Sequence, residues 1–140
     1  QWILPNICYE DIFGEEIADQ IRHEYKTGQP TPTVLLNVSN IAWFGNTIAL
    51  PQHLQISQMR SLETGRPMLR ATNTGTTAVI DARGRPVAWL PPYTRGELAT
   101  TIQGTRGATP FIRFGNLTIL IVALAALITA RLLATRKRSR

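Results

Sequence analysis

The chain has 140 residues, of which 44% are hydrophobic and 17% are charged. This balance excludes a disordered polyampholyte, and the length fits one domain at most. A single cysteine excludes a disulfide framework, and the cysteine and histidine residues lack the spacing of a zinc site. We therefore expect neither a bound metal ion nor a cofactor.

The net charge of +6 is concentrated at one end of the chain. All nine acidic residues lie at or before Glu97, whereas residues 131–140 contain five of the 15 basic residues. The rest of the chain is close to neutral, and a folded face that binds nucleic acid should itself be basic. The charge distribution therefore argues against nucleic acid as a partner.

The first third of the chain predicts a strand, a helix and a second strand. Residues 3–8 are strand-like, and residues 11–25 carry a helical stripe of apolar side chains with acids early and bases late. A loop rich in helix breakers leads to residues 33–38, an apolar and β-branched segment typical of a buried strand. Because the chain starts in a strand and no signal peptide is visible, we expect it to be the C-terminal piece of a longer protein.

The middle of the chain continues the same alternation. Residues 39–50 are irregular and rich in aromatic and polar side chains, and residues 51–63 predict a second helix that ends before Gly65. Further strands are predicted at residues 68–73, 78–81, 86–90 and 97–103. A strand–helix–strand–helix order followed by a hairpin is typical of the α/β class.

The last apolar segment has the properties of a membrane span. Residues 117–130 carry no charge, and extending the segment to residue 134 adds only Arg131. At about 1.5 Å per residue, residues 117–134 reach about 27 Å, close to the thickness of the hydrocarbon layer. Apolar side chains cover every face, which favours a span over a buried core helix. The positive-inside rule then places residues 135–140 in the cytoplasm and residues 1–110 on the other side.

Cys8 lies where the first strand gives way to a helix. Proteins of the α/β class place nucleophiles at such junctions, because a helix N-terminus stabilises both a thiolate and an oxyanion. A lone cysteine is also commonly a small buried hydrophobic residue. Its position alone leaves both interpretations open.

Several segments carry a family resemblance. Residues 7–13, with the sequence ICYEDIF, resemble the nucleophile segment of the nitrilase (carbon-nitrogen hydrolase) superfamily, whose members use a Cys–Glu–Lys triad. Later segments follow in the order of one branch, the bacterial apolipoprotein N-acyltransferases: NVSNIAWFG at 37–45, RSLETGRPMLRATNTG at 60–75, LPPYTRG at 90–96 and QGTRGATPFIRFG at 103–115. With the terminal span, the resemblance covers nearly the whole chain.

The resemblance implies a fold and a location. Residues 1–110 would form the periplasmic C-terminal half of a nitrilase-like α-β-β-α sandwich. Residues 111–134 would form a juxtamembrane segment and one transmembrane helix (about 117–134), and residues 135–140 a basic cytoplasmic tail. The full-length protein would be a multi-pass protein of the bacterial inner membrane.

The resemblance also implies an activity. Such enzymes transfer an acyl chain from a phospholipid to the α-amino group of the diacylglyceryl-cysteine that begins an apolipoprotein. The partners would thus be the phospholipid donor, the apolipoprotein acceptor and the membrane. Cys8 would carry the acyl chain as a thioester between the two half-reactions.

The roles of individual residues follow from the same resemblance. Cys8 matches the nucleophile, the backbone N–H of Tyr9 would donate to the oxyanion, and Glu10 matches a supporting acid. Glu10 is equally well explained as an ordinary acid of a first helical turn. Arg60, Glu63, Arg70 and Asn73 are interpreted as structural pairs around the second helix.

A second group of residues is predicted to bind substrate. Trp43 and Phe44 match a mobile aromatic loop that contacts acyl chains, with simple core packing as an equal alternative. Asn40 is predicted to orient this loop. His23 and His53 are interpreted as surface or hydrogen-bonded histidines outside the triad.

The glutamate and lysine of the triad would precede Cys8, and neither Lys26, in a loop, nor Lys137, in the tail, takes the place of that lysine. We therefore expect these 140 residues to be inactive by themselves. Two alternatives to the acyltransferase stay open. One is a membrane-tethered amidase that uses water as acceptor, and the other is a non-catalytic tail-anchored module whose basic end holds anionic lipids.

Overall fold

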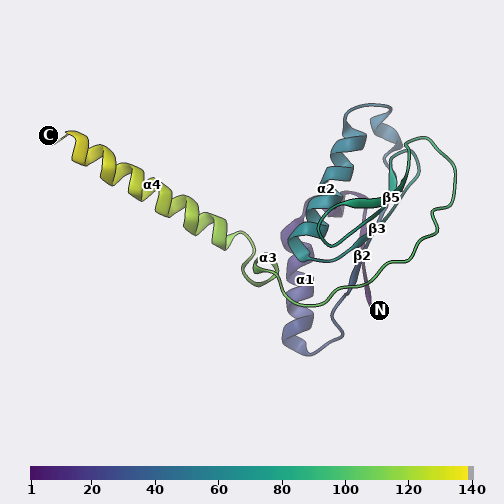
Figure 1. Ribbon diagram of the computed structural model, residues 1–140, viewed down its shortest axis with the longest axis horizontal. Coiled ribbons are helices and arrows are strands. Elements are labelled where there is room, and N and C mark those ends of the chain that lie inside the picture. The colour runs from purple at the N-terminus through teal and green to yellow at the C-terminus, as the bar shows by residue number, and fades with distance from the viewer. Residues whose placement is uncertain (139–140) are drawn as a thin grey trace.

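The computed structural model describes residues 1–138, which form a five-stranded sheet with helices packed on one face (Figure 1). The spatial order of the strands follows the chain: β1 (Ile3–Ile7), β2 (Val34–Ser39), β3 (Met68–Thr72), β4 (Thr77–Ile80) and β5 (Pro86–Leu90). Strands β1 to β3 are parallel, and β4 and β5 are added antiparallel. The α/β class predicted from the sequence is confirmed.

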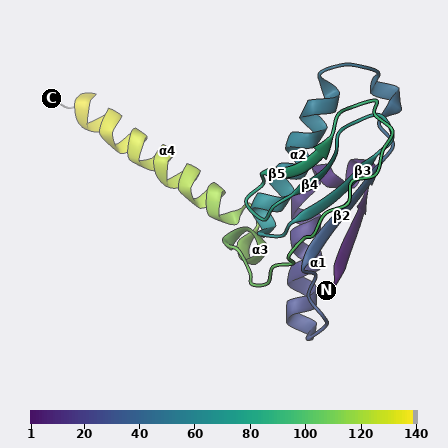
Figure 2. The same cartoon turned by 45° about the vertical axis from the view of Figure 1, so that its right-hand side comes forward.

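The helical layer covers one face of this sheet. Helices α1 (Gly14–Thr27) and α2 (Ala49–Thr64) connect the parallel strands and lie side by side on the same face, as Figure 2 shows. The short helix α3 (Pro110–Phe114) packs against α1, where Arg22 Nε donates to the carbonyl oxygen of Ile112 at 2.6 Å. The core between the layers consists of Leu4, Ile17, Ile21, Leu35, Met68, Ala78, Ile80 and Ile112.

The opposite face of the sheet keeps apolar side chains exposed. Burial alternates along β1, so that Ile3 and Ile7 point away from the helices. Ile7 is in register with Val38 of β2, and these two side chains are 66% and 49% exposed. This uncovered face is where a four-layer sandwich implies a second sheet.

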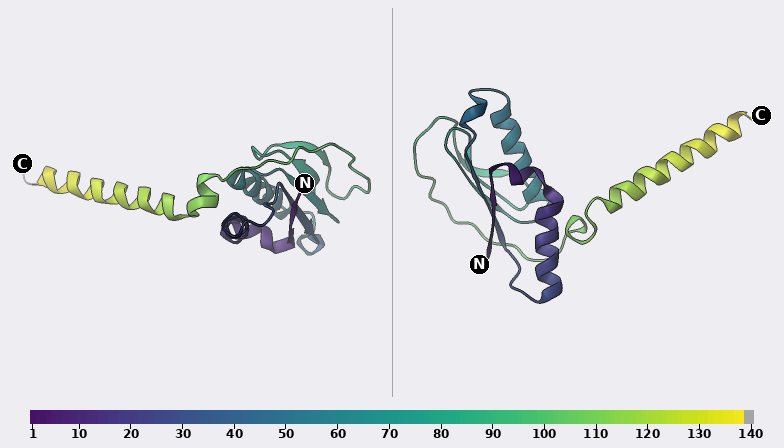
Figure 3. Two further views of the ribbon diagram at one scale, coloured as in Figure 1. Left: turned by 90° about the horizontal axis from the view of Figure 1, so that it is seen from below. Right: turned by 180° about the vertical axis from the view of Figure 1, so that it is seen from behind.

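Helix α4 (Leu117–Arg138) leaves the folded domain and extends away from it (Figure 3). Residues Leu117–Thr135 form a segment of 19 residues that is long and apolar enough to cross a membrane, and its apolar window is 0% buried although the helix contacts α3. Its bounds agree with the predicted span. Of the predicted basic tail, residues 139 and 140 lie outside the described part of the chain.

The first helix begins later than its periodicity predicts. Residues Cys8–Ile12 form a separate 3₁₀ turn, η1, and α1 begins only at Gly14. A hydrogen bond of Glu10 and the burial of Asp11 explain why the helix does not start earlier. The Glu10 carboxylate accepts a hydrogen bond from the backbone N–H of Ile7 at 2.6 Å, and the Asp11 side chain is fully buried. Both side chains hold the turn apart from the helix that follows.

The strand predicted at residues 97–103 is wrong. This stretch belongs to a long connection, residues 91–109, that forms no strand. The connection is fastened at separate points, such as Tyr93 N–H to the Thr74 carbonyl and Thr105 N–H to the Thr33 carbonyl, at 3.1 and 3.0 Å. The β propensity of Thr100, Thr101 and Ile102 is therefore not enough, because the segment pairs with none of the five strands of the sheet.

Two glycines with positive φ give a matched test of the fold. Gly84, at φ +75°, lies in the β4–β5 turn, where an added Cβ would come 2.7 Å from the carbonyl oxygen of Gln58. Gly28 ends α1 at φ +72°, with open space around it. We expect Gly28→Ala to lower the free energy of unfolding by about 1 kcal/mol and Gly84→Ala by about 2–4 kcal/mol, because only the latter adds overpacking to backbone strain. Chemical denaturation of the two variants measures the difference, and equal losses would contradict the predicted clash.

Candidate active site

Cys8 sits at the carboxyl end of β1, at the start of the 3₁₀ turn Cys8–Ile12, which we call the nucleophile turn. Its φ is +51°, and the only other non-glycine residue with positive φ among residues 1–138 is Tyr93. A left-handed conformation costs a non-glycine residue about 1–2 kcal/mol and persists only where the surroundings impose it. The half-buried thiol lies 3.6 Å from the carbonyl oxygen of Asn40. The cysteine is thus held in a strained and defined position.

The next two residues of the turn are exposed. The ring of Tyr9 meets that of Phe13 edge to face, with centroids 5.9 Å apart. The carboxylate of Glu10 accepts a hydrogen bond from the backbone N–H of Ile7, so this acid caps the N-terminal end of the turn. The capping contact accounts for Glu10 locally, and its role in catalysis, like that of the Tyr9 N–H, stays a prediction.

Asn40 joins Cys8 to the loop after β2, residues 40–48, which we call the aromatic loop. Its carbonyl oxygen accepts from the Cys8 thiol and from Nε1 of Trp43, the latter at 2.8 Å. Its Oδ1 accepts from Ala42 N–H at 3.3 Å and from Nδ2 of Asn73 at 2.7 Å. Asn40 therefore contacts both the nucleophile turn and the aromatic loop, and the orienting role predicted for it stays a prediction.

The two aromatic side chains of this loop face outward. Trp43 is 79% exposed and Phe44 is 43% exposed, and both belong to the short turn η2 (Ala42–Phe44). Core packing, the alternative interpretation, does not describe either ring in this part of the protein. Contact with an acyl chain stays a prediction for both.

A cluster of polar side chains is buried beneath the nucleophile turn. We call it the buried polar cluster; its members are Asn6, Asp11, Asn37, His53, Ser57 and Arg70, all 6% exposed or less. Arg70 Nη1 donates to Ser57 Oγ at 2.6 Å, and the Ser57 hydroxyl donates to Asp11 Oδ2. Burial raises the pKa of Asp11, while the Ser57 hydrogen bond and the Arg70 charge act in the opposite direction. Burial likewise lowers the pKa of Arg70 to about 10, against the opposing charges of Asp11 and the Cys8 thiolate.

Sequence reasoning missed Asp11, because the residue was assigned to a regular helix. The available signal was a set of polar residues inside otherwise apolar strands: Asn6, Asn37, Ser39 and Arg70, on three adjacent parallel strands. Parallel strands bring their carboxyl ends to one edge of the sheet, so such residues meet. The structural pairing predicted around the second helix is confirmed for Arg60, Glu63 and Arg70 by their contacts, whereas Asn73 donates to Asn40 in the loop after β2.

His53 is buried and not at the surface, which corrects one of the two interpretations given for it. Its Nδ1 lies 2.8 Å from Arg70 Nη1, whereas Nε2 has no partner among the described residues. Burial and the Arg70 charge lower the pKa of His53 to about 4. The neutral ring therefore accepts from Arg70 at neutral pH.

This shifted pKa predicts an acid-sensitive fold. Below pH 6.5 the unfolded chain binds a proton at His53 that the folded chain does not, so the free energy of unfolding falls as the pH drops from 6.5 to about 4. The loss amounts to about 3 kcal/mol at most. We expect His53→Asn, which keeps an acceptor for Arg70, to reduce this slope in denaturant titrations at several pH values. The same change at exposed His23 is the control, and an unaltered slope in His53→Asn would contradict the assignment.

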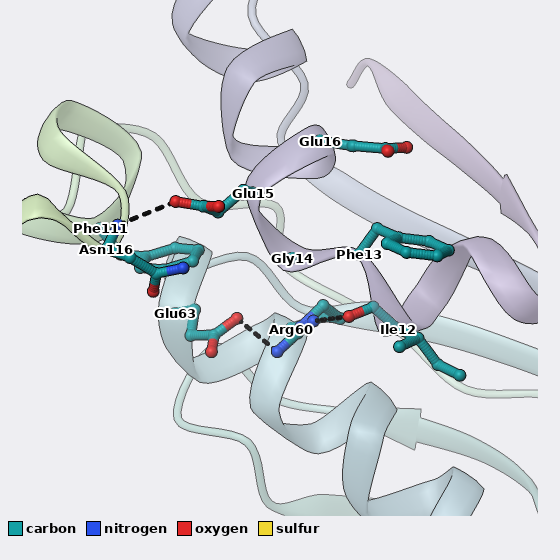
Figure 4. A pocket seen from close by; sticks show the side chains of 9 residues that line it. All are labelled: Ile12, Phe13, Gly14, Glu15, Glu16, Arg60, Glu63, Phe111 and Asn116. Atoms are coloured by element: carbon teal, nitrogen blue, oxygen red, sulfur yellow. Dashed lines mark hydrogen bonds and ion pairs between the residues drawn. The ribbon is translucent and has the colours of Figure 1, made fainter.

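A cavity of about 320 Å³ lies beside the site rather than in it (Figure 4). It separates the start of α1 from α2 and from the junction before α4. Arg60 donates to the Ile12 carbonyl at 2.9 Å and pairs with Glu63 at 2.8 Å, while Glu15 accepts from Asn116 N–H at 3.0 Å. None of the predicted site residues lines it.

Across residues 1–138, no group of three or more acidic, histidine or cysteine side chains is placed to hold a metal ion.

The sequence places this sheet and its cysteine in a known family. A model of the carbon-nitrogen hydrolase family matches residues 3–111, which include every strand and the nucleophile turn. The chain belongs to the carbon-nitrogen hydrolase family. The fold agrees with this assignment, because the carbon-nitrogen hydrolase from Helicobacter pylori G27 superposes with a TM-score of 0.52 at 12% identity, over 64% of this chain and 36% of that one. A mutant of the amidase from Nesterenkonia sp. AN1 superposes with a TM-score of 0.50 at 17% identity, over 64% and 34% of the two chains.

Within the carbon-nitrogen hydrolase family, the chain is similar to a group of proteins that share one name. It is 54% identical over 139 residues to a protein of Ralstonia nicotianae named apolipoprotein N-acyltransferase, covering 99% of this chain and 25% of that protein. It is 58% identical over 116 residues to a protein of the same name from Nitrosomonas europaea, covering 83% and 22%. The chain thus spans about a quarter of the length of these relatives. The resemblance stated from the sequence is confirmed.

Proposed function

We propose that the full-length protein containing this chain is an apolipoprotein N-acyltransferase of the bacterial inner membrane. The observation that carries this proposal is the combination, in one chain, of a strained cysteine at the end of β1 and an apolar helix able to span a membrane. A soluble enzyme would have no need of the second feature. The identity to relatives with this name, above half over most of the chain, supports the same conclusion.

The reaction has two half-reactions at Cys8. The thiolate attacks the carbonyl carbon of a phospholipid ester, the tetrahedral oxyanion collapses, and the lysophospholipid leaves as an alcohol after gaining a proton. The acyl chain is then a thioester on Cys8. The α-amino group of a diacylglyceryl-cysteine attacks this thioester, loses a proton, and releases the thiolate as the amide forms. The backbone N–H of Tyr9 would donate to the oxyanion, and the triad's glutamate and lysine would come from the segment that the resemblance places before Cys8.

The aromatic loop would bind the acyl chain near the reacting atom. Asn40 contacts both Cys8 and Trp43, so the exposed ring of Trp43 is connected to the nucleophile through one residue. In this proposal the loop covers apolar substrate surface that would otherwise face water. Helix α4 would keep the domain at the membrane, with residues 1–110 in the periplasm and the C-terminus in the cytoplasm.

A matched pair of tryptophans tests the role of the loop. Trp43 in the aromatic loop and Trp89 in β5 are 79% and 59% exposed. We expect Trp43→Ala to lower kcat/KM for the phospholipid about tenfold, because the lost apolar contact is worth about 1.4 kcal/mol or more. Trp89→Ala should leave it unchanged. Equal effects of the two variants, measured with purified full-length protein in detergent, would exclude a specific role for Trp43.

One experiment tests the whole proposal. The full-length protein is incubated with a phospholipid that carries an isotope-labelled acyl chain, and the peptide containing Cys8 is examined by mass spectrometry for a hydroxylamine-sensitive acyl adduct. A diacylglyceryl lipopeptide is then added. Labelled acyl amide on the lipopeptide supports the acyltransferase. Labelled free fatty acid without acyl amide indicates hydrolysis, and absence of the adduct on Cys8 overturns the proposed mechanism.

A further inference from the structure

Two opposite charges lie fully buried beneath the nucleophile turn. The side chains of Asp11 and Arg70 are both 0% exposed, and Arg70 Nη1 is 3.9 Å from Asp11 Oδ2. A buried ion pair is commonly no more stabilising than apolar residues of the same size, because both ions lose their hydration. The pair is therefore poorly explained by stability alone. Its position, between three parallel strands and the cysteine, points to a constraint on geometry.

One chain of contacts leads from Arg70 to the far end of the turn. Arg70 Nη1 donates to Ser57 Oγ at 2.6 Å, and the Ser57 hydroxyl donates to Asp11 Oδ2. Ser57 belongs to α2, so this first arm fixes the fourth residue of the nucleophile turn to the helical layer. Arg60 adds to the hold by donating to the Asp11 carbonyl at 3.2 Å.

A second chain of contacts leads from Arg70 to the cysteine itself. Arg70 Nη1 also donates to Asn37 Oδ1 at 3.3 Å. Asn37 Nδ2 donates to Asn6 Oδ1 at 2.6 Å and lies 3.4 Å from the carbonyl oxygen of Cys8, to which it also donates. This second arm reaches the first residue of the turn from the strands β1 and β2.

We propose that Arg70 is a positioning residue, which holds Cys8 in its left-handed conformation by fixing both ends of the nucleophile turn. The inference rests on the proposed function only in taking Cys8 as the nucleophile. Strain at one residue persists where several contacts over-determine the backbone, and the two arms supply such contacts.

The chain offers a matched control for this role. Arg66 is 1% exposed and is also held by carbonyl oxygens, those of Pro32 and Gly107, each at 2.7 Å. It makes no contact with the nucleophile turn in the described structure. Arg70→Met and Arg66→Met therefore remove the same side chain from equally buried places, and only the first removes the two arms. Ser57→Ala is a milder variant that cuts the first arm and leaves the ion pair in place.

The readout is the rate at which iodoacetamide alkylates Cys8, followed by mass spectrometry of the Cys8 peptide in full-length protein at fixed pH. If Arg70 only stabilised the fold, Arg70→Met and Arg66→Met would change this rate to the same extent. We expect Arg70→Met to lower it about 10- to 100-fold and Ser57→Ala about threefold to tenfold, since small misplacements of a reacting group have effects of this size. Arg66→Met should stay within about twofold of the wild-type rate, although its melting temperature falls as well.

The outcomes separate clearly. If Arg70→Met does not fold, Ser57→Ala decides, because a hydroxyl-to-hydrogen change keeps both charges. Wild-type alkylation rates in Ser57→Ala and in any folded Arg70→Met, or an equal loss in Arg66→Met, overturn the proposal. Alkylation needs no lipid, so a wild-type protein that forms no thioester with phospholipid would remove the acyltransferase function without touching this inference.

Discussion

Replacing Cys8 with alanine is expected to lower N-acylation of a lipopeptide by at least about 10³-fold, a loss of the size seen when a catalytic nucleophile is removed. No other side chain of this chain can carry the thioester, because Cys8 is its only cysteine. Acylation is measured by mass spectrometry of the lipopeptide product with purified full-length protein. The same preparation reports whether the variant still folds, through its melting temperature.

A second substitution at the same position separates chemistry from stability. At φ +51° glycine is less strained than any residue with a Cβ, so Cys8→Gly should be more stable than Cys8→Ala by about 1 kcal/mol. Both variants should nevertheless be inactive. If activity is instead higher in the more stable variant, Cys8→Gly, than in Cys8→Ala, Cys8 acts only by stabilising the fold. Full activity in either variant would favour the non-catalytic module.

Most of the sheet could be predicted because its signals are local. Alternating and continuous apolar runs mark β1 to β5, and the predicted strand at residues 86–90 agrees with β5 to the residue. The stripe in α1 and the glycine after α2 likewise express periodicity and capping, which the neighbouring sequence determines. The family resemblance at residues 7–13 strengthens the prediction, left open by the position of Cys8 alone, that the junction after β1 carries the nucleophile.

The remaining features depend on contacts between distant residues. Asp11 has the sequence position of an ordinary first-turn acid, and only Ser57 and Arg70, brought together by folding, make it a buried anchor. For His53 the sequence leaves a surface and a hydrogen-bonded position open, and only the packing of α2 over β3 decides for the buried one. Residues 97–103 have strand propensity but pair with none of the five strands of the sheet. In each case the tertiary environment, which a single sequence does not display, overrides the local preference.

The apolar composition of α4 supports a second prediction of large effect. Its Leu, Ile and Val side chains each favour insertion by about 0.3–0.6 kcal/mol, whereas an arginine at the centre of a span opposes it by about 2.5–3.5 kcal/mol. Ala126 lies midway along Leu117–Thr135, and its side chain is exposed. One arginine there should therefore cancel much of the insertion free energy. Ala134→Arg is the matched control, because an arginine near the end of the span reaches the headgroups as Arg131 can.

Reporter fusions at the C-terminus of the full-length protein measure the result. Green fluorescent protein is fluorescent when it is fused on the cytoplasmic side, and alkaline phosphatase is active only outside the cytoplasm. With the proposed orientation, the wild-type and Ala134→Arg fusions should be fluorescent and lack phosphatase activity, because the span carries the C-terminus inward. Ala126→Arg should reverse both signals, since a helix that fails to insert leaves its end in the periplasm. Phosphatase activity in the wild-type fusion would contradict the orientation itself, and identical signals from the two arginine variants would show that α4 is not held in the bilayer by its own apolar length.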